Sequence, residues 1–395
     1  MAHKTLQKNT LLTRQLPIQV PKKKNIAVIG GGIFGIFSAL KLTERGYMVT
    51  IFEKSSDILT GASYLNQNRL HMGYHYPRSE ETATSSNIYQ KVFTRMFEKV
   101  IVDDFDHYYC IAKEGSKTSS REYLAFCDKV GIPYIKEFPK EITINKDIVS
   151  LSIKVPEKIY DATLLRKTLR EMLEQDKGID LHLATEAINL TIQDDGLVID
   201  YKHKDRTTSK KFDAVLNATY SNMNKILIKA GIPVKEYQYE LCEVPVVTVP
   251  WGKRIGCGIM DGPFFGILPL GFAEEYLLYD VVLSVLERSF GVLPKFVHSV
   301  SYYDSEKVRQ ERFARYINKA KKYIVEMEQC KYLYSFYVVR MILPNRDHDD
   351  ARPTEVFRHG QGLWSIFAGK ISAAIPVSDK IVDEVENYFN GEKKV

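Results

Sequence analysis

The sequence predicts an α/β fold in which one α/β domain is interrupted by a mostly antiparallel β domain. Residues 25–54 have the pattern of a strand, a glycine turn, a helix and a second strand, which is typical of a parallel β-α-β unit. Residues 237–303 hold a series of alternating or apolar segments that favour strands. Residues 363–389 return to a strand, a turn and a last helix. We therefore expect the two ends of the chain to share one domain.

The glycine turn has the spacing G-x-G-x-x-G, with Gly30, Gly32 and Gly35. In this motif the first glycine permits the turn, the second lets the backbone approach a pyrophosphate, and the third lets the helix pack on the strand. The N-terminus of the helix offers free N–H groups to the phosphates. Glu53, at the end of the second strand, can accept hydrogen bonds from ribose hydroxyls. Together these features predict a Rossmann-like site for NAD or FAD, and the fingerprint does not separate the two.

The 395 residues are enough for a large core and for about two domains. The net charge of +6 comes from a basic tail, because residues 1–24 hold six lysines and arginines and no acid, which leaves 49 basic and 49 acidic residues elsewhere. A body without net charge argues against a broad nucleic-acid surface. No apolar run approaches about 18 residues, so we expect no transmembrane helix.

Five cysteines are scattered along the chain, in an odd number and without a C-x-x-C pair. They are typical of reduced thiols, and with the lack of an apolar signal-peptide core they predict a cytoplasmic protein. The sequence has no H-E-x-x-H motif, Cys/His cluster or paired acidic motif, so we expect no metal site. It does not indicate an oligomeric state.

After residue 54 the chain continues as a polar, aromatic loop to residue 80. Residues 81–102 are predicted to be a helix, because Ile88, Val92, Met96 and Val100 recur at four-residue steps. The elements expected next are a strand over 108–112, a helix over 119–130, strands within 135–160, a helix from the N-cap Asp161 to about residue 175, and a short strand over 180–183.

Residues 187–201 and 211–217 are expected to bring the chain back into the first sheet. After the β-rich region we expect a charged amphipathic helix over 304–328 and further strands over 332–343 and 363–367. We assign residues 1–24 to the tail. The dinucleotide-binding domain then comprises 25–110, 150–225 and 345–390, and the substrate domain comprises 111–149 and 226–344.

Four stretches carry a resemblance to a known family: the fingerprint, NQNRLHMGYHY at 66–76, FDAVLNATYS at 212–221 and WSIFAGKI at 364–371. With them, residues 25–385 resemble the FAD-dependent oxidoreductases of the D-amino-acid oxidase superfamily, nearest to the branch with L-2-hydroxyglutarate dehydrogenase and glycine oxidase. The resemblance implies bound FAD, a Rossmann-like FAD-binding domain and a β substrate domain. Tyr220 stands where the family has a glycine, so this turn lacks a residue that adopts a positive φ without strain.

The resemblance implies that His71 lies against the flavin ring, within a His71-Met72-Gly73 element. His71 would then act as a base, hydrogen-bond the flavin or carry a covalent flavin link, and a packed loop histidine is the alternative. The residues expected to contact the cofactor are Gly30, Gly32, Gly35, Glu53, Lys54, Arg69, Gly73, Ala218, Thr219, Gly369, Lys370 and Ile371.

Relatives that oxidise acids hold the substrate carboxylate with an arginine fork and tyrosines. By this resemblance Arg340 and Arg352 are candidates, with Tyr239 and Tyr337 as possible partners, and a structural or solvated arginine is the alternative for each. A second dinucleotide fingerprint is absent from the sequence, so we expect the electrons to come from the organic substrate.

The predicted function is hydride transfer from a small polar substrate to FAD. The donor is of the 2-hydroxy acid or amino acid class, or is linked to a sugar, and presents a CH–OH or CH–NH₂ group. The alternative is an FAD- or NAD-binding protein without net redox turnover, either a sensor or scaffold or a protein that uses FAD as the sugar mutases do.

Overall fold

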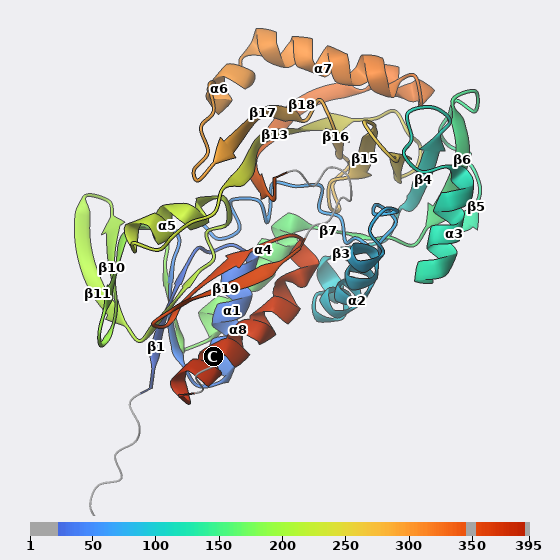
Figure 1. Cartoon of the computed structure of the whole chain (residues 1–395). Helices are drawn as coiled ribbons and strands as arrows, with labels where there is room; N and C mark the ends of the chain where they lie inside the picture. Colours follow the sequence, from blue (N-terminus) through green and yellow to red (C-terminus); the bar gives the residue numbers. More distant parts are fainter. Residues whose placement is uncertain (1–22, 345–352, 392–395) are drawn as a thin grey trace, which may run out of the picture.

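The computed structural model describes residues 23–344 and 353–391, which form two large sheets with helices around them (Figure 1). The predicted tail therefore lies outside the described residues except for its last two positions. Arg352 also lies outside them. No helix within the described ranges is both long and apolar enough to cross a membrane.

A six-stranded sheet contains the predicted β-α-β unit. β1 (Asn25–Ile29), α1 (Ile33–Glu44) and β2 (Met48–Phe52) occupy the expected residues. The strand order is β19-β20-β12-β1-β2-β8, parallel throughout except that β19 is antiparallel to β20. The other strands are β8 (Ile179–His182), β12 (Ala214–Asn217), β19 (Glu355–Gly360) and β20 (Leu363–Phe367). The two ends of the described chain share this sheet, as predicted.

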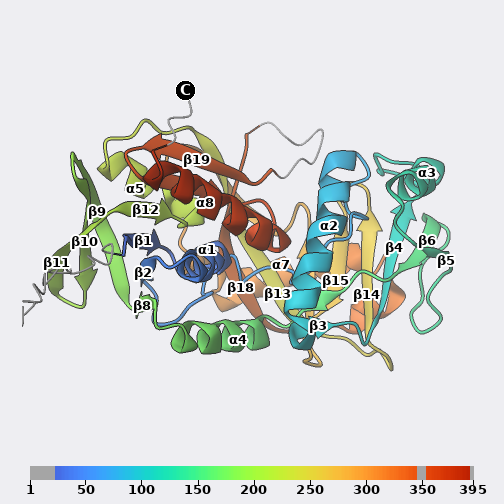
Figure 2. The ribbon, with the colours of Figure 1, turned by 90° about the horizontal axis from the view of Figure 1, so that it is seen from below.

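Both faces of the six-stranded sheet are covered, because alternate residues of its strands are apolar on both sides (Figure 2). Ile26 and Val28 of β1 pack toward helices α1, α4 (Ala162–Gln175) and α8 (Ala374–Phe389). Ala27 and Ile29 face the opposite layer. That layer contains β9 (Thr185–Gln193), β10 (Gly196–His203), β11 (Arg206–Phe212) and α5 (Met223–Lys229).

The expected return of residues 187–201 and 211–217 to the first sheet is wrong for most of these residues. β9, β10 and β11 form a separate antiparallel sheet, and only β12 joins the six-stranded one among these strands. The apolar residues Leu190, Leu197 and Ile199 lie on one face of the small sheet and pack against the large sheet. Alternation predicts a strand, but it does not tell whether a strand extends a sheet or covers it.

The second large sheet is mostly antiparallel, as predicted, with the order β17-β13-β16-β15-β14-β4-β6-β5 and β18 paired to β13; β4 and β14 form its parallel pair. Its strands are β4 (Asp106–Ala112), β5 (Ile135–Lys136), β6 (Val149–Val155), β13 (Tyr237–Thr248), β14 (Ile255–Met260), β15 (Phe265–Pro269), β16 (Tyr276–Asp280), β17 (Val285–Gly291) and β18 (Lys331–Ile342). The domain boundaries remain a proposal. The predicted boundaries put most of β4 and β6 in the dinucleotide-binding domain. Because both strands belong to this sheet, they would instead be assigned to the substrate domain.

Short helices surround the second sheet. α3 (Ser120–Val130) begins with a capping box between Ser119 and Glu122 and ends at Gly131 in the left-handed region. α6 (Val300–Tyr303) and α7 (Glu306–Ala320) lie across the top in Figure 1. The single helix predicted over 304–328 is wrong at its end. α7 stops at Ala320, Ile324 then bridges to Ile144, and a 3-10 turn follows at Val325–Gln329.

The helix predicted over 81–102 is α2 (Glu80–Met96), followed by a 3-10 turn (Glu98–Val100), β3 (Ile101–Val102) and, antiparallel to β3, β7 (Ile159–Tyr160). Of the apolar residues that predicted this helix, the three that lie in α2 do not form its buried face. Ile88, Val92 and Met96 are 54%, 38% and 43% exposed, and Val100 of the predicted set is buried beyond the helix end. The buried face of α2 is instead largely small and polar, with Thr82, Ala83, Ser86, Gln90 and Phe93. It packs near residues 370–373, where Lys370 bonds to Thr82 and Ser86.

This assignment of faces is testable with two neighbouring positions. Phe93→Ala removes a fully buried ring and should lower the free energy of unfolding by about 3–5 kcal/mol. Val92→Ala, on the exposed face, should change it by less than about 0.5 kcal/mol. Urea unfolding followed by circular dichroism measures both values. A larger loss for Val92→Ala than for Phe93→Ala would mean that the helix is turned the other way.

Candidate active site

One cavity of about 770 Å³ lies between the two large sheets. It is lined by the β1–α1 turn, the end of β2, the loop after residue 60, the β12–α5 turn, the end of β18 and residues 366–372. Several of these segments follow the carboxyl ends of parallel strands, which is where ligands bind in open α/β sheets. Its size is that of a small-molecule or cofactor site.

The three glycines of the fingerprint are required for different reasons. Gly30 has a φ of +111°, and a Cβ there would lie 2.7 Å from the carbonyl oxygen of Ala218. A Cβ at Gly35 would lie 2.0 Å from the carbonyl oxygen of Gly30, so this glycine is needed for packing. A Cβ at Gly32 would meet only the Ser63 Oγ, at 3.5 Å, and would otherwise project into open space. The protein itself leaves room at Gly32, which fits the close approach of a pyrophosphate.

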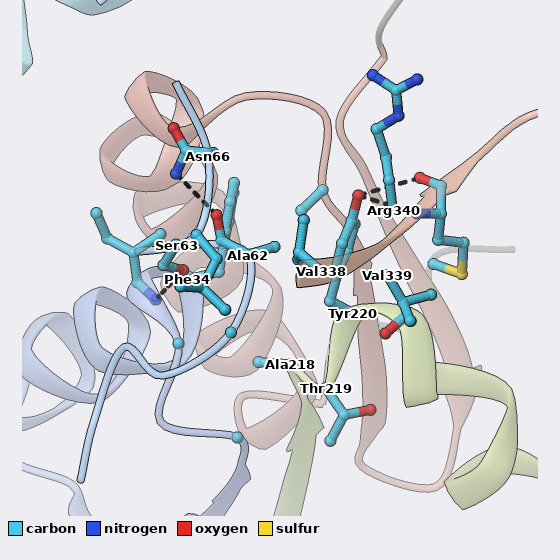
Figure 3. A pocket seen from close by; sticks show the side chains of 18 of the residues that line it. Phe34, Ala62, Ser63, Asn66, Ala218, Thr219, Tyr220, Val338, Val339 and Arg340 are labelled. Carbon is cyan, nitrogen blue, oxygen red and sulfur yellow. Dashed lines mark hydrogen bonds between the residues drawn. The ribbon is translucent and has the colours of Figure 1, made fainter. Parts of the chain in front are cut away.

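The N-terminus of α1 faces the cavity beside the loop that holds Ala62 and Ser63 (Figure 3). The first turn contains no acidic residue, and Gly32 at the N-cap supplies no side-chain cap. The Ile33 N–H donates to Ser63 Oγ at 3.1 Å. This end of the helix therefore presents its positive dipole to the cavity, as a phosphate-binding helix does.

Glu53 lines the cavity and is held by two backbone amides. Gly31 N–H donates to Oε2 at 2.7 Å and Ser55 N–H donates to Oε1 at 2.8 Å, and the residue is 8% exposed. A carboxylate accepts about four hydrogen bonds, so capacity remains for a ribose hydroxyl. Lys54 lines the same end, where Lys225 and Glu186 form an ion pair at 2.8 Å.

The structure brings most of the predicted site residues to this cavity. Gly35 and Gly73 do not line it, and Gly73 instead approaches α2, where a Cβ would lie 3.1 Å from that of Ala83. Gly73, at a φ of +120°, thus serves the packing of the loop on α2. The predicted residues that line the cavity are Gly30, Gly32, Glu53, Lys54, Arg69, His71, Ala218, Thr219, Arg340, Gly369, Lys370 and Ile371.

Arg69 belongs to a buried polar cluster. Its Nη1 donates to the Tyr109 hydroxyl at 2.9 Å, and its Nε lies 3.8 Å from Oε1 of Glu157. Glu157 also accepts bonds from the Tyr109 hydroxyl at 2.5 Å and from the Met72 N–H at 2.7 Å. Burial raises the pKa of Glu157, while Arg69, the Tyr109 hydroxyl and the Met72 N–H favour its charged form. Arg69 is thus anchored in the protein and contributes its charge to one wall of the cavity.

His71 follows this cluster in the loop and lines the cavity with His75 and Tyr76, whose rings lie 5.7 and 5.2 Å from its own. Its Nδ1 is buried and has no hydrogen-bond partner. Burial lowers the pKa of His71 well below 6.5, and the positive charges of Arg69 and Lys370 lower it further. His71 is therefore a neutral imidazole at pH 7, and its unpartnered Nδ1 is available to a ligand.

Lys370 lies at the turn between β20 and α8. Its Nζ donates to Ser86 Oγ and, at 3.3 Å, to the Thr82 carbonyl, and it lies 3.7 Å from the centroid of the Tyr76 ring. The preceding Gly369 N–H donates to Thr354 Oγ1 at 2.9 Å. The Lys370 side chain thus joins α2 to the cavity wall and places a positive charge near His71.

Arg340, on β18, lines the cavity but already has partners. Its Nε donates to Glu240 Oε2 at 2.9 Å, its Nη2 bonds to the same oxygen, and its Nη1 donates to the Tyr279 hydroxyl at 3.1 Å. Glu240 is buried and also pairs with Arg288 at 3.1 Å. An arginine has five N–H groups, so two on Arg340 are left for a ligand.

The two tyrosines named with Arg340 differ in placement. Tyr337 lines the cavity and donates to Asp304 at 3.2 Å. Tyr239 does not line the cavity; it is buried and donates to the Val292 carbonyl at 2.9 Å.

Sequence reasoning missed several residues that shape the site. Ser63 lies in the small-residue stretch T-G-A-S after the fingerprint, which is a usable signal for a loop that approaches a helix N-terminus. Glu240 is a lone acid between Tyr239 and Leu241, and such an acid in a predicted strand region indicates a buried ion pair. Glu157, between Pro156 and Lys158, carries no such signal. Tyr279 carries no comparable signal.

A comparison with family models now identifies the protein class. The model described as FAD dependent oxidoreductase, DAO, matches residues 25–364. The chain belongs to this family. The resemblance predicted from four sequence stretches is thereby confirmed, and the choice between NAD and FAD that the fingerprint left open is decided in favour of FAD.

Two curated relatives are fungal proteins. The chain is 24% identical over 376 residues to the FAD-dependent monooxygenase FPY4 of Fusarium mangiferae, across 92% of this chain and 91% of that protein. It is 26% identical over 296 residues to the FAD-dependent monooxygenase kojA of Aspergillus flavus, across 71% of this chain and 65% of that protein.

Solved structures share the fold at lower identity. Glycine oxidase from Geobacillus kaustophilus superposes with a TM-score of 0.69 at 16% identity, covering 92% of this chain and 95% of that one. L-proline dehydrogenase from P. horikoshii has a TM-score of 0.67 at 16% identity, with 95% and 96% covered. L-amino acid deaminase from Proteus vulgaris has a TM-score of 0.67 at 13% identity, with 95% of each chain covered.

The different demands on Gly32 and Gly35 give a paired prediction. Gly35→Ala forces a Cβ against a carbonyl and should destabilise the FAD-free protein by about 1–3 kcal/mol. Gly32→Ala should leave its stability within about 0.5 kcal/mol. It should nevertheless weaken FAD binding about tenfold or more, because the methyl group takes the space of the pyrophosphate, and tenfold is about 1.4 kcal/mol.

Urea unfolding of the FAD-free proteins and titration of flavin fluorescence measure the two quantities separately. If Gly32→Ala bound FAD as tightly as the parent chain, the backbone at residue 32 would not approach the phosphates.

Proposed function

We propose that this protein oxidises a small polar substrate at a carbon bearing a hydroxyl or an amine, and that the hydride passes to FAD. The 2-hydroxy acid and amino acid classes are favoured, and a sugar-linked substrate is the nearest variant. The observation that carries the proposal is that the fingerprint and the His71 loop line one continuous cavity. A protein that only bound FAD or NAD would not need the His71 loop beside the fingerprint.

FAD, when bound, supplies the hydride acceptor. The residues that would hold it are Gly30 and Gly32 with the N-terminus of α1 at the pyrophosphate, Glu53 and Lys54 at the adenosine, and Ala218, Thr219 and Gly369 to Ile371 along the rest. Support comes from the open space at Gly32, the uncapped helix end and the acceptor capacity of Glu53. These contacts stay proposals.

In the proposed reaction the substrate carbon loses a hydride and its hydroxyl or amine loses a proton, which leaves a C=O or C=N bond. His71 is the proposed proton acceptor, because it is neutral and lines the cavity. The two remaining N–H groups of Arg340 would orient a substrate oxygen. Arg352 lies outside the described residues and stays a candidate for the same task.

The names of the similar proteins support the proposed oxidation reaction in a general way. Glycine oxidase, L-proline dehydrogenase and L-amino acid deaminase are named for amine-bearing substrates, and the fungal relatives are named monooxygenases. The electron acceptor, O₂ or another, is left open. All five cysteines are free and buried, which supports the proposed cytoplasmic location.

Anaerobic bleaching of the flavin tests the function. The FAD-loaded protein is mixed, in the absence of O₂, with panels of 2-hydroxy acids, amino acids and sugars. The absorbance is followed at about 450 nm, where oxidised flavin absorbs. Loss of the band with one panel would identify the donor class. Bleaching by NADPH, with none by any panel, would replace the proposal with a monooxygenase reaction. Acid precipitation of the same sample tells covalent from released flavin.

The role of His71 predicts a pH dependence. Its lowered pKa keeps the imidazole neutral as pH falls through 6.5, so the rate of flavin reduction should stay constant from pH 8 to below 6.5 and decline only at lower pH. His71→Asn should reduce the rate by about 10²–10⁴-fold, the usual contribution of a general base.

Stopped-flow measurement of flavin reduction with the identified substrate tests both statements. His359→Asn is the matched control, since His359 is half-buried, bonds to Ser365 Oγ at 2.7 Å and does not line the cavity. A rate that falls with an apparent pKa at or above 6.5 would exclude His71 as the base.

A further inference from the structure

Tyr220 has a backbone conformation that bulky residues rarely adopt. Its φ is +52°, in the left-handed region, directly after the Ala218–Thr219 turn that follows β12. Side chains other than glycine and asparagine are strained there, because Cβ approaches the following carbonyl. Such strain persists only where other contacts over-determine the conformation, so the contacts of the Tyr220 side chain are decisive.

The Tyr220 hydroxyl makes two hydrogen bonds to one residue of the opposite sheet. It accepts from the Met341 N–H at 3.1 Å and donates to the Met341 carbonyl at 3.3 Å. Figure 3 shows the Tyr220 side chain reaching across to the strand that carries Arg340. One hydroxyl thus pairs both polar groups of a single backbone residue.

Met341 is well placed to receive these bonds. It lies near the end of β18, which in the described part of the chain pairs with β13 and with no further strand. An edge strand leaves outward-facing N–H and C=O groups unpaired, and the Tyr220 hydroxyl takes the place of a neighbouring strand at this point. The bond therefore connects the turn after β12, in the six-stranded sheet, to the edge of the nine-stranded sheet.

Both ends of this connection line the cavity. Ala218, Thr219 and Tyr220 form one part of its wall, and residues 338–343 of β18 and its continuation form another. The two walls belong to different sheets, so separating them would open the cavity. The Tyr220 hydroxyl and the Met341 backbone join these two segments directly.

We propose that Tyr220 is a clasp that closes the cavity over bound FAD, and that the chain retains its strained backbone because the hydroxyl bridges the two sheets at that point. The clasp slows the release of the cofactor. It also fixes the position of β18, and with it Arg340, the residue before Met341. This inference rests on FAD binding by the family and not on the substrate class proposed above.

The test is the rate of FAD release from the loaded protein, followed by the rise of flavin fluorescence after dilution. Tyr220→Phe keeps the ring and removes the hydroxyl, and should release FAD about 3- to 10-fold faster, in line with the loss of a hydrogen bond. Tyr123→Phe would also remove a buried tyrosine hydroxyl. It disturbs the His71 loop, however, because its hydroxyl bonds to the Tyr74 carbonyl at 2.9 Å, and Tyr316→Phe is therefore used in its place as the matched control. Tyr316→Phe loses a buried hydroxyl bond of 3.1 Å to Ser284 Oγ, neither residue lines the cavity, and the variant should release FAD at the parental rate.

A second variant separates the clasp from the strain. Tyr220→Gly relieves the strained φ and removes the ring and the hydroxyl together. The Tyr220 ring packs against the core beneath the six-stranded sheet, so this variant also loses that packing. It should release FAD at least as fast as Tyr220→Phe. Release by Tyr220→Phe at the parental rate, or equally accelerated release by Tyr316→Phe, would overturn the proposal. Failure of every substrate panel to bleach the flavin would overturn the proposed function and leave this result unchanged.

Discussion

The loop that places His71 depends on one buried carboxylate. Glu157 accepts the Met72 N–H, beside His71, and the Tyr109 hydroxyl of β4, and it lies against Arg69 of the same loop. The backbone of the loop is also paired to the segment around β7, with bonds from Leu70 to Lys158 and from Tyr160 to Asn68. Removing one partner of a buried ion pair costs about 3–5 kcal/mol, because the other charge is left uncompensated. The loop is therefore held by side-chain and backbone contacts on both sides of His71.

The same arrangement sets the charge of the cavity. Burial lowers the pKa of His71, and the nearby charges of Arg69 and Lys370 lower it further, so the imidazole stays neutral. Lys370 is held in place by Thr82 and Ser86, which explains why the buried face of α2 is polar. A helix that served only the core would have buried Ile88, Val92 and Met96 instead. Because the partners of Lys370 occupy the buried face of α2, the apolar residues of this helix lie on its exposed face.

Local signals in the sequence were enough for the elements that are defined by neighbouring residues. The fingerprint predicts β1, α1 and β2 in their observed order within residues 25–54, and the N-cap Asp161 predicts the start of α4, whose Leu164 N–H bonds to its side chain at 2.8 Å. Both depend on contacts within a few residues. The family resemblance then indicated which segments line the cavity, because residues from each of its four stretches lie in the cavity wall.

What the sequence could not predict depends on distant partners. Which face of α2 is buried depends on Lys370, which lies 284 positions after Ser86. That β9, β10 and β11 form a sheet of their own depends on their packing against the large sheet. Tyr220 is the clearest case. From sequence alone a tyrosine at this turn argues against a positive φ, but the structure has φ of +52° there, because Met341 in another sheet bonds to its hydroxyl. Local propensity is overridden where a tertiary bond offsets the strain.

Arg340 shows how such distant partners bear on the chemistry. Despite burial, which raises it, the pKa of Glu240 is lowered by Arg340, so both members of this pair are charged. Glu240 neutralises Arg340, and Arg288, which adds a further positive charge, is half exposed and screened by solvent. A substrate carboxylate at Arg340 would gain two directed hydrogen bonds but little net Coulomb attraction. Arg340 is therefore suited to orient an oxygen, and a neutral hydroxyl can use it almost as well as an acid. This is the physical reason that sugar-linked donors stay beside amino acids and 2-hydroxy acids among the proposed substrates.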